Sequence, residues 1–294
     1  MRIKALYTVL CLLMALGCRA RAAESDADAP GTAAATEPDA DAPGTAVYSE
    51  GLTLEARAGY SIGATTPIGI PATIRKLNSF HLTPNFLIGI DARMQMFGRW
   101  GIQAGLHLEN KGMDAAVTTK GYHMAMVKDG EELEGVYTGR VEQHVKQWML
   151  TVPLQVCYVL DGGGRRVKAA AAPQHSEQGR NRWCLRAGPY ISLLTARDFS
   201  GNVSDGYLRK DTPTGQKIEI GHEEDERATY DFSGDMRRWQ AGIAIGADWR
   251  MASRLGISAD LSWGLTGIMR SDFKTVEQTL YPIYGTISIT YKLN

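Results

Sequence analysis

Three groups of residues in this sequence have types and spacings that could do chemistry. The run 222–226 (His-Glu-Glu-Asp-Glu) offers oxygen ligands to a divalent cation, but carboxylates in a flexible run bind weakly, so a solvated acidic loop is the better interpretation. The glycine run 162–164 resembles a phosphate cradle, yet it lacks the Lys-Ser/Thr pair of a phosphate-binding loop and suits a turn. An Asp/His hydrolase would draw on His81, His107, His123, His144, Asp91 and Glu109. Nothing places a nucleophile, a base and an orienting group together, so we expect no enzyme, no cofactor and no metal site.

Two cysteines, Cys157 and Cys184, lie on the same face of two successive predicted strands, near ends that a hairpin would bring together. In an oxidising compartment such a pair can form a disulfide. The residues leave two interpretations open, a disulfide and two free, small, buried side chains.

Nine charged side chains lie in segments where every second residue is apolar, and each occupies a position between the apolar ones. They are Glu55, Arg57, Asp91, Arg93, Glu109, Arg186, Asp248, Asp260 and Lys292. A buried unpaired charge costs several kcal/mol, so the core of a soluble protein would not accept this set on one shared side. We expect an ionic network inside a lumen, formed by the pairs Glu55/Arg57 and Asp91/Arg93, the group Arg186/Asp248/Asp260, and Glu109.

These charges belong to segments in which apolar and polar residues alternate, the pattern of a strand with one apolar face. The segments span residues 52–62, 85–96, 100–109, 148–158, 183–193, 239–249, 255–265 and 281–293. Each is about 10 to 13 residues long, close to what a tilted strand needs to cross a bilayer. The sequence therefore predicts an all-β fold, an eight-stranded antiparallel up-and-down transmembrane β-barrel, with apolar residues toward lipid and charges in the lumen.

The gaps between these segments and the aromatic residues at their ends agree with a barrel in an outer membrane. Gaps 98–99 and 251–254 are short, whereas 112–146 and 199–238 are long, as expected for periplasmic turns and outer loops; 161–181 is long for a periplasmic turn. Two belts of aromatic residues are predicted. The periplasmic belt holds Trp100, Tyr158, Trp183, Trp249 and Tyr291, and the outer belt holds Tyr60, Phe86, Trp148, Trp239 and Tyr281.

The amino-terminal region predicts export. A basic start, the apolar run 5–17 and Ala20-Arg21-Ala22 indicate a signal peptide, residues 1–22, cleaved after Ala22; the alternative is a lipobox with Cys18 acylated. Residues 23–48 contain an eight-residue repeat and almost no large apolar side chain, so we expect a disordered periplasmic tether. The barrel domain then spans 49–294.

Composition narrows the choice of partners. Lys and Arg number 32, as do Asp and Glu, so net charge offers no case for nucleic acid. The interior of a barrel of about eight strands is only wide enough for side chains, so we expect a filled, non-conducting, monomeric barrel in contact with outer-membrane lipid.

Several stretches resemble the PorT-like outer-membrane β-barrels typical of Bacteroidota. They are Leu54–Tyr60, Gly105–Gly112, Leu150–Leu154, Gly188–Tyr190 and Tyr284–Tyr291, while Leu293-Asn294 departs from an aromatic last residue. The resemblance, which covers residues 51–294, implies no shared catalytic residues; its best-known member type serves protein secretion and gliding machinery.

We therefore expect a non-enzymatic structural or interaction component of the outer membrane, working in a secretion or envelope assembly and contacting its partners through the outer loops. The alternative is a soluble, lipocalin-like barrel that carries a small apolar ligand, which requires an inward apolar face.

Overall fold

A computed structural model describes residues 51–67, 69, 72–81, 83–161, 182–210, 214–273, 275 and 279–294. They belong to one unit, Ser49–Asn294. The predicted signal peptide with its cleavage after Ala22, the alternative acylation of Cys18, the tether 23–48 and the glycine run 162–164 lie outside the described residues.

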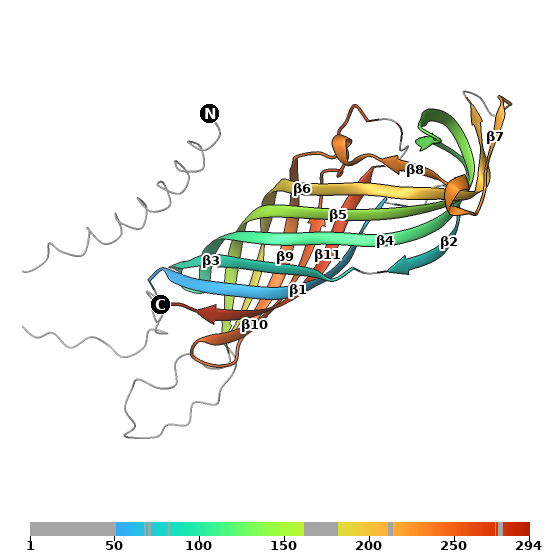
Figure 1. Cartoon of the computed structure of the whole chain (residues 1–294). Coiled ribbons are helices and arrows are strands. Elements are labelled where there is room, and N and C mark those ends of the chain that lie inside the picture. Colours follow the sequence, from blue (N-terminus) through green and yellow to red (C-terminus); the bar gives the residue numbers. More distant parts are fainter. Residues whose placement is uncertain are drawn as a thin grey trace, which may run out of the picture. The chain divides into compact units, whose positions relative to one another are not determined.

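Eight antiparallel strands close into a barrel, which confirms the predicted fold (Figure 1). They are β1 (Thr53–Pro67), β3 (Asn85–Phe97), β4 (Trp100–Lys128), β5 (Glu131–Asp161), β6 (Arg182–Lys210), β9 (Trp239–Arg250), β10 (Leu255–Gly264) and β11 (Leu280–Lys292). The order around the ring is β4-β3-β1-β11-β10-β9-β6-β5, and β5 pairs again with β4. Lipid offers no hydrogen-bond partners to the backbone groups of an open sheet edge, and closure of the ring removes such an edge from the bilayer section.

The first and last strands close the barrel over a long ladder. Pairing of β1 with β11 runs from Glu55↔Lys292 to Pro67↔Leu280. At the periplasmic end, the side-chain amide of Asn294 accepts a hydrogen bond from Leu54 N and donates one to Leu52 O. The side chain of Asn294 thus provides hydrogen-bond partners for two backbone groups at the start of the first strand.

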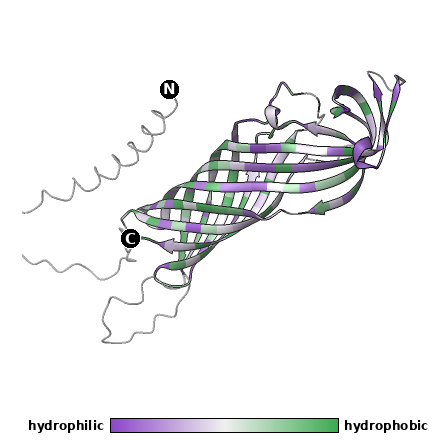
Figure 2. Ribbon diagram, viewed as in Figure 1, coloured by the Kyte–Doolittle hydropathy of each residue, from purple (hydrophilic) through white to green (hydrophobic). Residues whose placement is uncertain are grey.

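Exposure in the bilayer section is the inverse of that in a soluble protein. On β11, Ile287 and Ile289 are 67% and 64% exposed on the outside, whereas Ser288 between them is 1% exposed in the lumen. Figure 2 shows the resulting alternation of apolar and polar residues along the strands. Among the described residues, no helix combines the length and apolarity needed to cross a membrane.

The prediction of a long outer loop at 112–146 is wrong, because this segment is a β-hairpin. Pairing of β4 with β5 continues outward to Lys128↔Glu131. Asp129 and Gly130 join the strands with φ of 54° and 83°, the positive values that a type I′ turn requires. The strands continue although the outward side chains are polar here, since this part faces water and needs no apolar exterior.

The expected outer loop 199–238 also contains β structure. β6 continues to Lys210, and the elements that follow are β7 (Lys217–Ile220), η1 (Glu224–Glu226), β8 (Ala228–Asp231) and η2 (Ser233–Asp235). β7 and β8 both pair with β6. A further strand, β2 (Ile74–His81), pairs with β4. The outer end of the barrel is thus a folded extension (Figure 1).

The polarity of both faces inverts where the strands leave the bilayer section. The outward face of β5 changes from Leu150 and Trp148 to Lys146, His144 and Glu142. The inward face becomes an apolar cluster, which includes Met113, Met124, Met126, Tyr137, Val141, Val145, Phe199, Val203 and Leu208. The molecule therefore has two interiors, a polar lumen in the bilayer section and an apolar core outside it.

Candidate functional site

Strand alternation and register bring charged residues of separate strands together in the lumen. Glu55 of β1 lies directly opposite Asp91 of β3, and residues opposite each other share a face. On the far wall, Asp248 of β9 lies opposite Ser258 of β10. All eight residues of the expected network lie on the lumen side.

The centre of the lumen is a cluster of buried arginines and aspartates. Arg57 Nε donates to Asp91 Oδ2 at 2.8 Å, and its Nη1 donates to Asp260 Oδ2 at 2.6 Å. Arg186 Nη2 lies 2.7 Å from Asp260 Oδ1 and 2.9 Å from Asp248 Oδ1. Both arginine side chains are only 1% exposed. Asp260 therefore bridges two cations and ties opposite walls of the barrel together.

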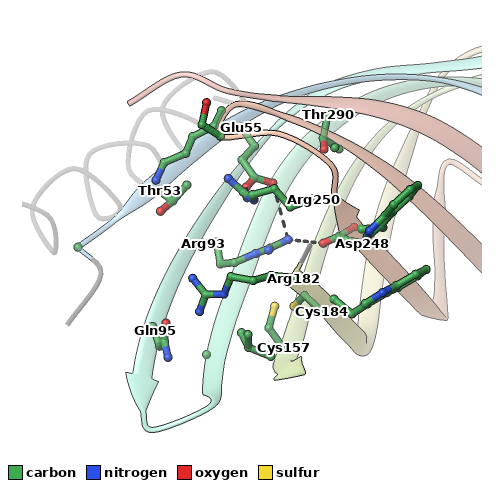
Figure 3. A pocket seen from close by; sticks show the side chains of 18 residues that line it. Thr53, Glu55, Arg93, Gln95, Cys157, Arg182, Cys184, Asp248, Arg250 and Thr290 are labelled. Atoms are coloured by element: carbon green, nitrogen blue, oxygen red, sulfur yellow. Dashed lines mark hydrogen bonds and ion pairs between the residues drawn. The ribbon is translucent and has the colours of Figure 1, made fainter. Parts of the chain in front are cut away.

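A second group occupies the periplasmic end of the lumen (Figure 3). Arg93 pairs with Asp248 and, at 3.7 Å, with Glu55, and Arg250 pairs with Glu55. Arg93 also donates to Gln103 Oε1 at 2.7 Å and 3.0 Å. The cavity left beside these side chains measures about 100 Å³. The network therefore continues from the centre of the lumen to its periplasmic mouth.

Lys111 closes the lumen at its outer end. Its Nζ lies 2.8 Å from Glu109 Oε2 and 5.5 Å from the ring centres of Tyr190 and Tyr284. Cations bind the faces of aromatic rings at this range. One level further in, His107 Nε2 lies 2.9 Å from Asp91 Oδ1, which joins this layer to the central cluster.

The group Arg186, Asp248 and Asp260 meets in the lumen, but the other pairings differ from those expected. Glu55 and Arg57 were expected to pair along one strand, but neighbours of this kind stand about 7 Å apart and point the same way. They pair across the barrel instead, Arg57 with Asp91 and Asp260, and Glu55 with Arg93 and Arg250.

Two members of the network, Lys111 and Arg250, were missed. Both share the strand parity of predicted residues, Glu109 and Asp248. The expected strands ended too early to include them.

Cys157 and Cys184 are buried and free; the thiol of Cys157 donates to Gln103 Oε1 at 3.9 Å, and the thiol of Cys184 donates to Leu185 O at 3.7 Å. The hairpin brings them close, as expected, but not directly opposite each other, because the register places Cys157 opposite Arg186 and Cys184 opposite Val159. They are diagonal neighbours, and both line the periplasmic cavity (Figure 3). The disulfide stays a prediction.

The histidines considered for hydrolysis are dispersed. His144 pairs with Asp114 and His123 approaches Glu134, both in the outer extension, whereas His107 lies in the lumen. The acidic run 222–226 forms an exposed turn around η1. Within the described ranges, no group of three or more His, Cys, Asp or Glu residues is arranged to hold a metal ion.

The apolar core of the outer extension holds buried tyrosines that structure it. Tyr137 OH donates to Ser204 O at 2.6 Å, which links β5 to β6, and Tyr230 OH donates to Glu142 O at 2.8 Å. Burial raises the pKa of both phenols. Each therefore remains a neutral hydrogen-bond donor over the physiological range of pH.

A sequence model described as "Outer membrane protein beta-barrel domain" matches residues 39–270. The chain belongs to this family. Membership places the barrel in the outer membrane, in contact with its lipid, with the short turns on the periplasmic side and the extension outside. The inward polar face of the bilayer section is the opposite of what the lipocalin-like alternative requires. No curated protein matches the chain.

Solved structures of outer-membrane proteins are similar to this barrel at low identity. The outer membrane protein OprG from Pseudomonas aeruginosa is 10% identical, with a TM-score of 0.35 over 83% of this chain and 97% of that chain. The attachment invasion locus protein Ail of Yersinia pestis is 9% identical, with a TM-score of 0.34 over 83% and 99%. Neisserial surface protein A is 9% identical, with a TM-score of 0.32 over 83% and 98%.

Proposed function

We propose that this barrel is a non-enzymatic, non-conducting component of the outer membrane that presents a rigid extracellular surface to envelope or secretion proteins. The observation that carries the first part is the filled lumen. Ion pairs cross it at the level of Arg57 and Arg186, and the space between there and Lys111 measures about 40 Å³. A barrel of eight strands leaves room for side chains rather than for a water column.

The rigidity of the outer extension supports the second part. The hairpin of β4 and β5 is paired to its tip, and its inward face packs into the apolar cluster with Phe199 and Val203 of β6. A preorganised surface binds a partner with a smaller entropic cost than a flexible loop. The resemblance to PorT-like barrels favours a secretion or envelope assembly as the setting.

Conductance in planar lipid bilayers tests the closed lumen. The purified barrel is expected to show negligible single-channel conductance, because the arginine–aspartate layer excludes a continuous water path. Large, stable openings of the purified protein would contradict a filled lumen.

Site-specific photocrosslinking in native outer membranes tests the interaction role. A photoreactive residue at Glu132, exposed near the hairpin tip, is expected to form an adduct with another envelope protein. The same residue at Ile245, which is 55% exposed in the bilayer section, is the matched control and should crosslink to lipid only. Absence of protein adducts throughout 112–146 would refute the role of the hairpin.

A further inference from the structure

The outer wall of the barrel has a seam between β1 and β2. Pairing of β1 with β3 ends at Ser61↔Asn85, while β1 continues to Pro67 paired only with β11. β2 pairs only with β4. Within the described residues, no ladder joins this edge of β1 to β2, and Thr65 N donates instead to the thioether sulfur of Met113 at 3.3 Å. A thioether is a weak acceptor, so the seam is weakly held.

The seam begins at the outer aromatic belt. Tyr60↔Phe86 is the second-to-last pair of the β1–β3 ladder before the seam. Phe86 packs edge-on against Trp148, with ring centres 5.2 Å apart. Aromatic residues of this kind mark the boundary between the hydrocarbon and the headgroups. The seam therefore opens sideways at the height of the headgroups of the outer leaflet.

An apolar cavity of about 380 Å³ lies behind the seam. Its wall includes Ala64 of β1, Leu77 and Phe80 of β2, and Met113 and Ala115 of β4. Leu77 and Phe80 are 58% and 42% exposed, which is costly for such side chains in water. The volume falls within the range of about 300–1,000 Å³ that is typical of small-molecule sites.

Polar groups at the cavity indicate which kind of apolar molecule fits. Gln143 lines the wall, and its Nε2 is buried without a hydrogen-bond partner among the described residues. Such an orphaned donor favours a ligand that brings an acceptor. Arg75, Lys76 and Lys120 are exposed and are sequence neighbours of the lining residues Ile74, Leu77 and Thr119, so three cations lie close to the cavity.

We propose that this cavity binds a single-chain anionic amphiphile of the long-chain fatty acid type, which enters through the seam from the outer leaflet. The acyl chain occupies the apolar cavity, the carboxylate faces these cations, and the amide of Gln143 donates to an oxygen of the ligand. This inference does not rest on the proposed interaction role, since the hairpin can contact partners with the cavity full or empty.

Photolabelling with hexadecanoic acid that carries a diazirine at the chain end tests the site. The full barrel is reconstituted into phosphatidylcholine nanodiscs, irradiated, and mapped by peptide mass spectrometry. Adducts are expected on inward residues of the extension, such as Met113 and Phe199, and excess hexadecanoic acid should suppress them. Labelling confined to lipid-facing residues such as Val152 would overturn the proposal.

Matched variants separate binding from folding. Ala115→Phe fills the cavity and should lower inward labelling at least about tenfold, because the ring takes the space of the chain. Ala104→Phe is the control, since it makes the same change on the lipid-facing side of the same strand and should leave labelling unchanged. Heat-modified migration on gels checks that both variants fold. Unchanged labelling of folded Ala115→Phe would overturn the proposal.

Competition tests the anionic head. Hexadecanol should compete less well than hexadecanoic acid for the wild-type barrel. The reversal Lys76→Glu with Lys120→Glu should abolish this preference while the neutral alcohol still competes, because only the charge close to the cavity changes. Equal competition by acid and alcohol in the wild type would overturn the assignment of an anionic ligand.

Discussion

Arg57 shows what holds the lumen together at the scale of single residues. Its guanidinium, 1% exposed, contacts carboxylates from three other strands, Asp91, Asp260 and, at 3.8 Å, Asp248. Buried charges of this kind are tolerated only when they are paired and hydrogen-bonded. Removal of one cation therefore leaves carboxylates that are largely buried and lack a compensating charge.

Arg57→Met is expected to destabilise the folded barrel by about 3–5 kcal/mol, because it leaves Asp91 and Asp260 with less compensation. Arg140→Met is the control, since Arg140 and Glu142 form a pair that is 39% exposed on each side, and such pairs contribute about 0–1 kcal/mol. Urea unfolding in lipid vesicles, followed by tryptophan fluorescence, measures both. Similar losses in the two variants would contradict an ionic lumen that supports stability.

The cysteine pair yields a second prediction for single residues. Cys157 and Cys184 line a cavity at the periplasmic mouth, where an oxidant can reach them. We expect a disulfide in protein isolated from the outer membrane, so that the denatured, unreduced mature chain resists thiol labelling and takes two labels after reduction. Cys157→Ser, which should leave Cys184 free to react, is the control. Two reactive thiols before reduction would show that the bridge does not form.

At the scale of elements, β5 is one strand with two environments. Its outward residues are apolar as far as Trp148 and polar from Lys146 onward, while pairing with both neighbours continues. Backbone pairing therefore does not depend on which solvent the outward face meets. The position of the inversion marks the edge of the lipid.

Val152→Arg should destabilise the barrel by about 2–4 kcal/mol, the cost of a cation on the lipid face near the middle of a bilayer. Val152 is 47% exposed in the bilayer section. Lys146→Val, on the same face of the same strand but beyond the inversion, should change stability by no more than about 0.5 kcal/mol. The same urea titration measures both. A mild effect of Val152→Arg would contradict the placement of Val152 near the middle of the bilayer.

At the scale of the whole molecule, the extension outside the bilayer is as regular as the barrel within it. β4, β5 and β6 continue past the ring as one sheet; β7 pairs with β6 at the far end, and β8 pairs with β6 nearer the ring and also with β4 (Figure 1). The molecule therefore presents folded structure rather than loops to the exterior.

Trypsin treatment of intact cells distinguishes a folded extension from a flexible loop. Residues 112–146 contain several lysines and an arginine, yet backbone that is paired in a sheet cannot enter a protease site. We expect cleavage in this segment only beside the turn, at Lys128, and resistance at Lys120 and Arg140. Rapid cutting at these two residues would indicate that the hairpin is open on cells.

The sequence by itself determined the strands, their faces and the class of protein. Alternation with a period of two is local, so it identified all eight barrel strands and the side on which Arg57, Arg186 and Asp260 lie. It also excluded a soluble core, because too many charges shared that side. The family match and the closed ring agree with this interpretation.

Only the tertiary structure decided which charges meet, where the strands end and how the wall opens. Arg57 reaches Asp260 across more than two hundred residues of chain, a contact set by ring closure and register rather than by local pattern. Sequence reasoning missed the hairpin beyond Met113, because outside the lipid the apolar residues of its strands point inward and the polar residues point outward. The seam between β1 and β2 arises from partner exchange along β4, which pairs with β3 near the bilayer and with β2 outside it.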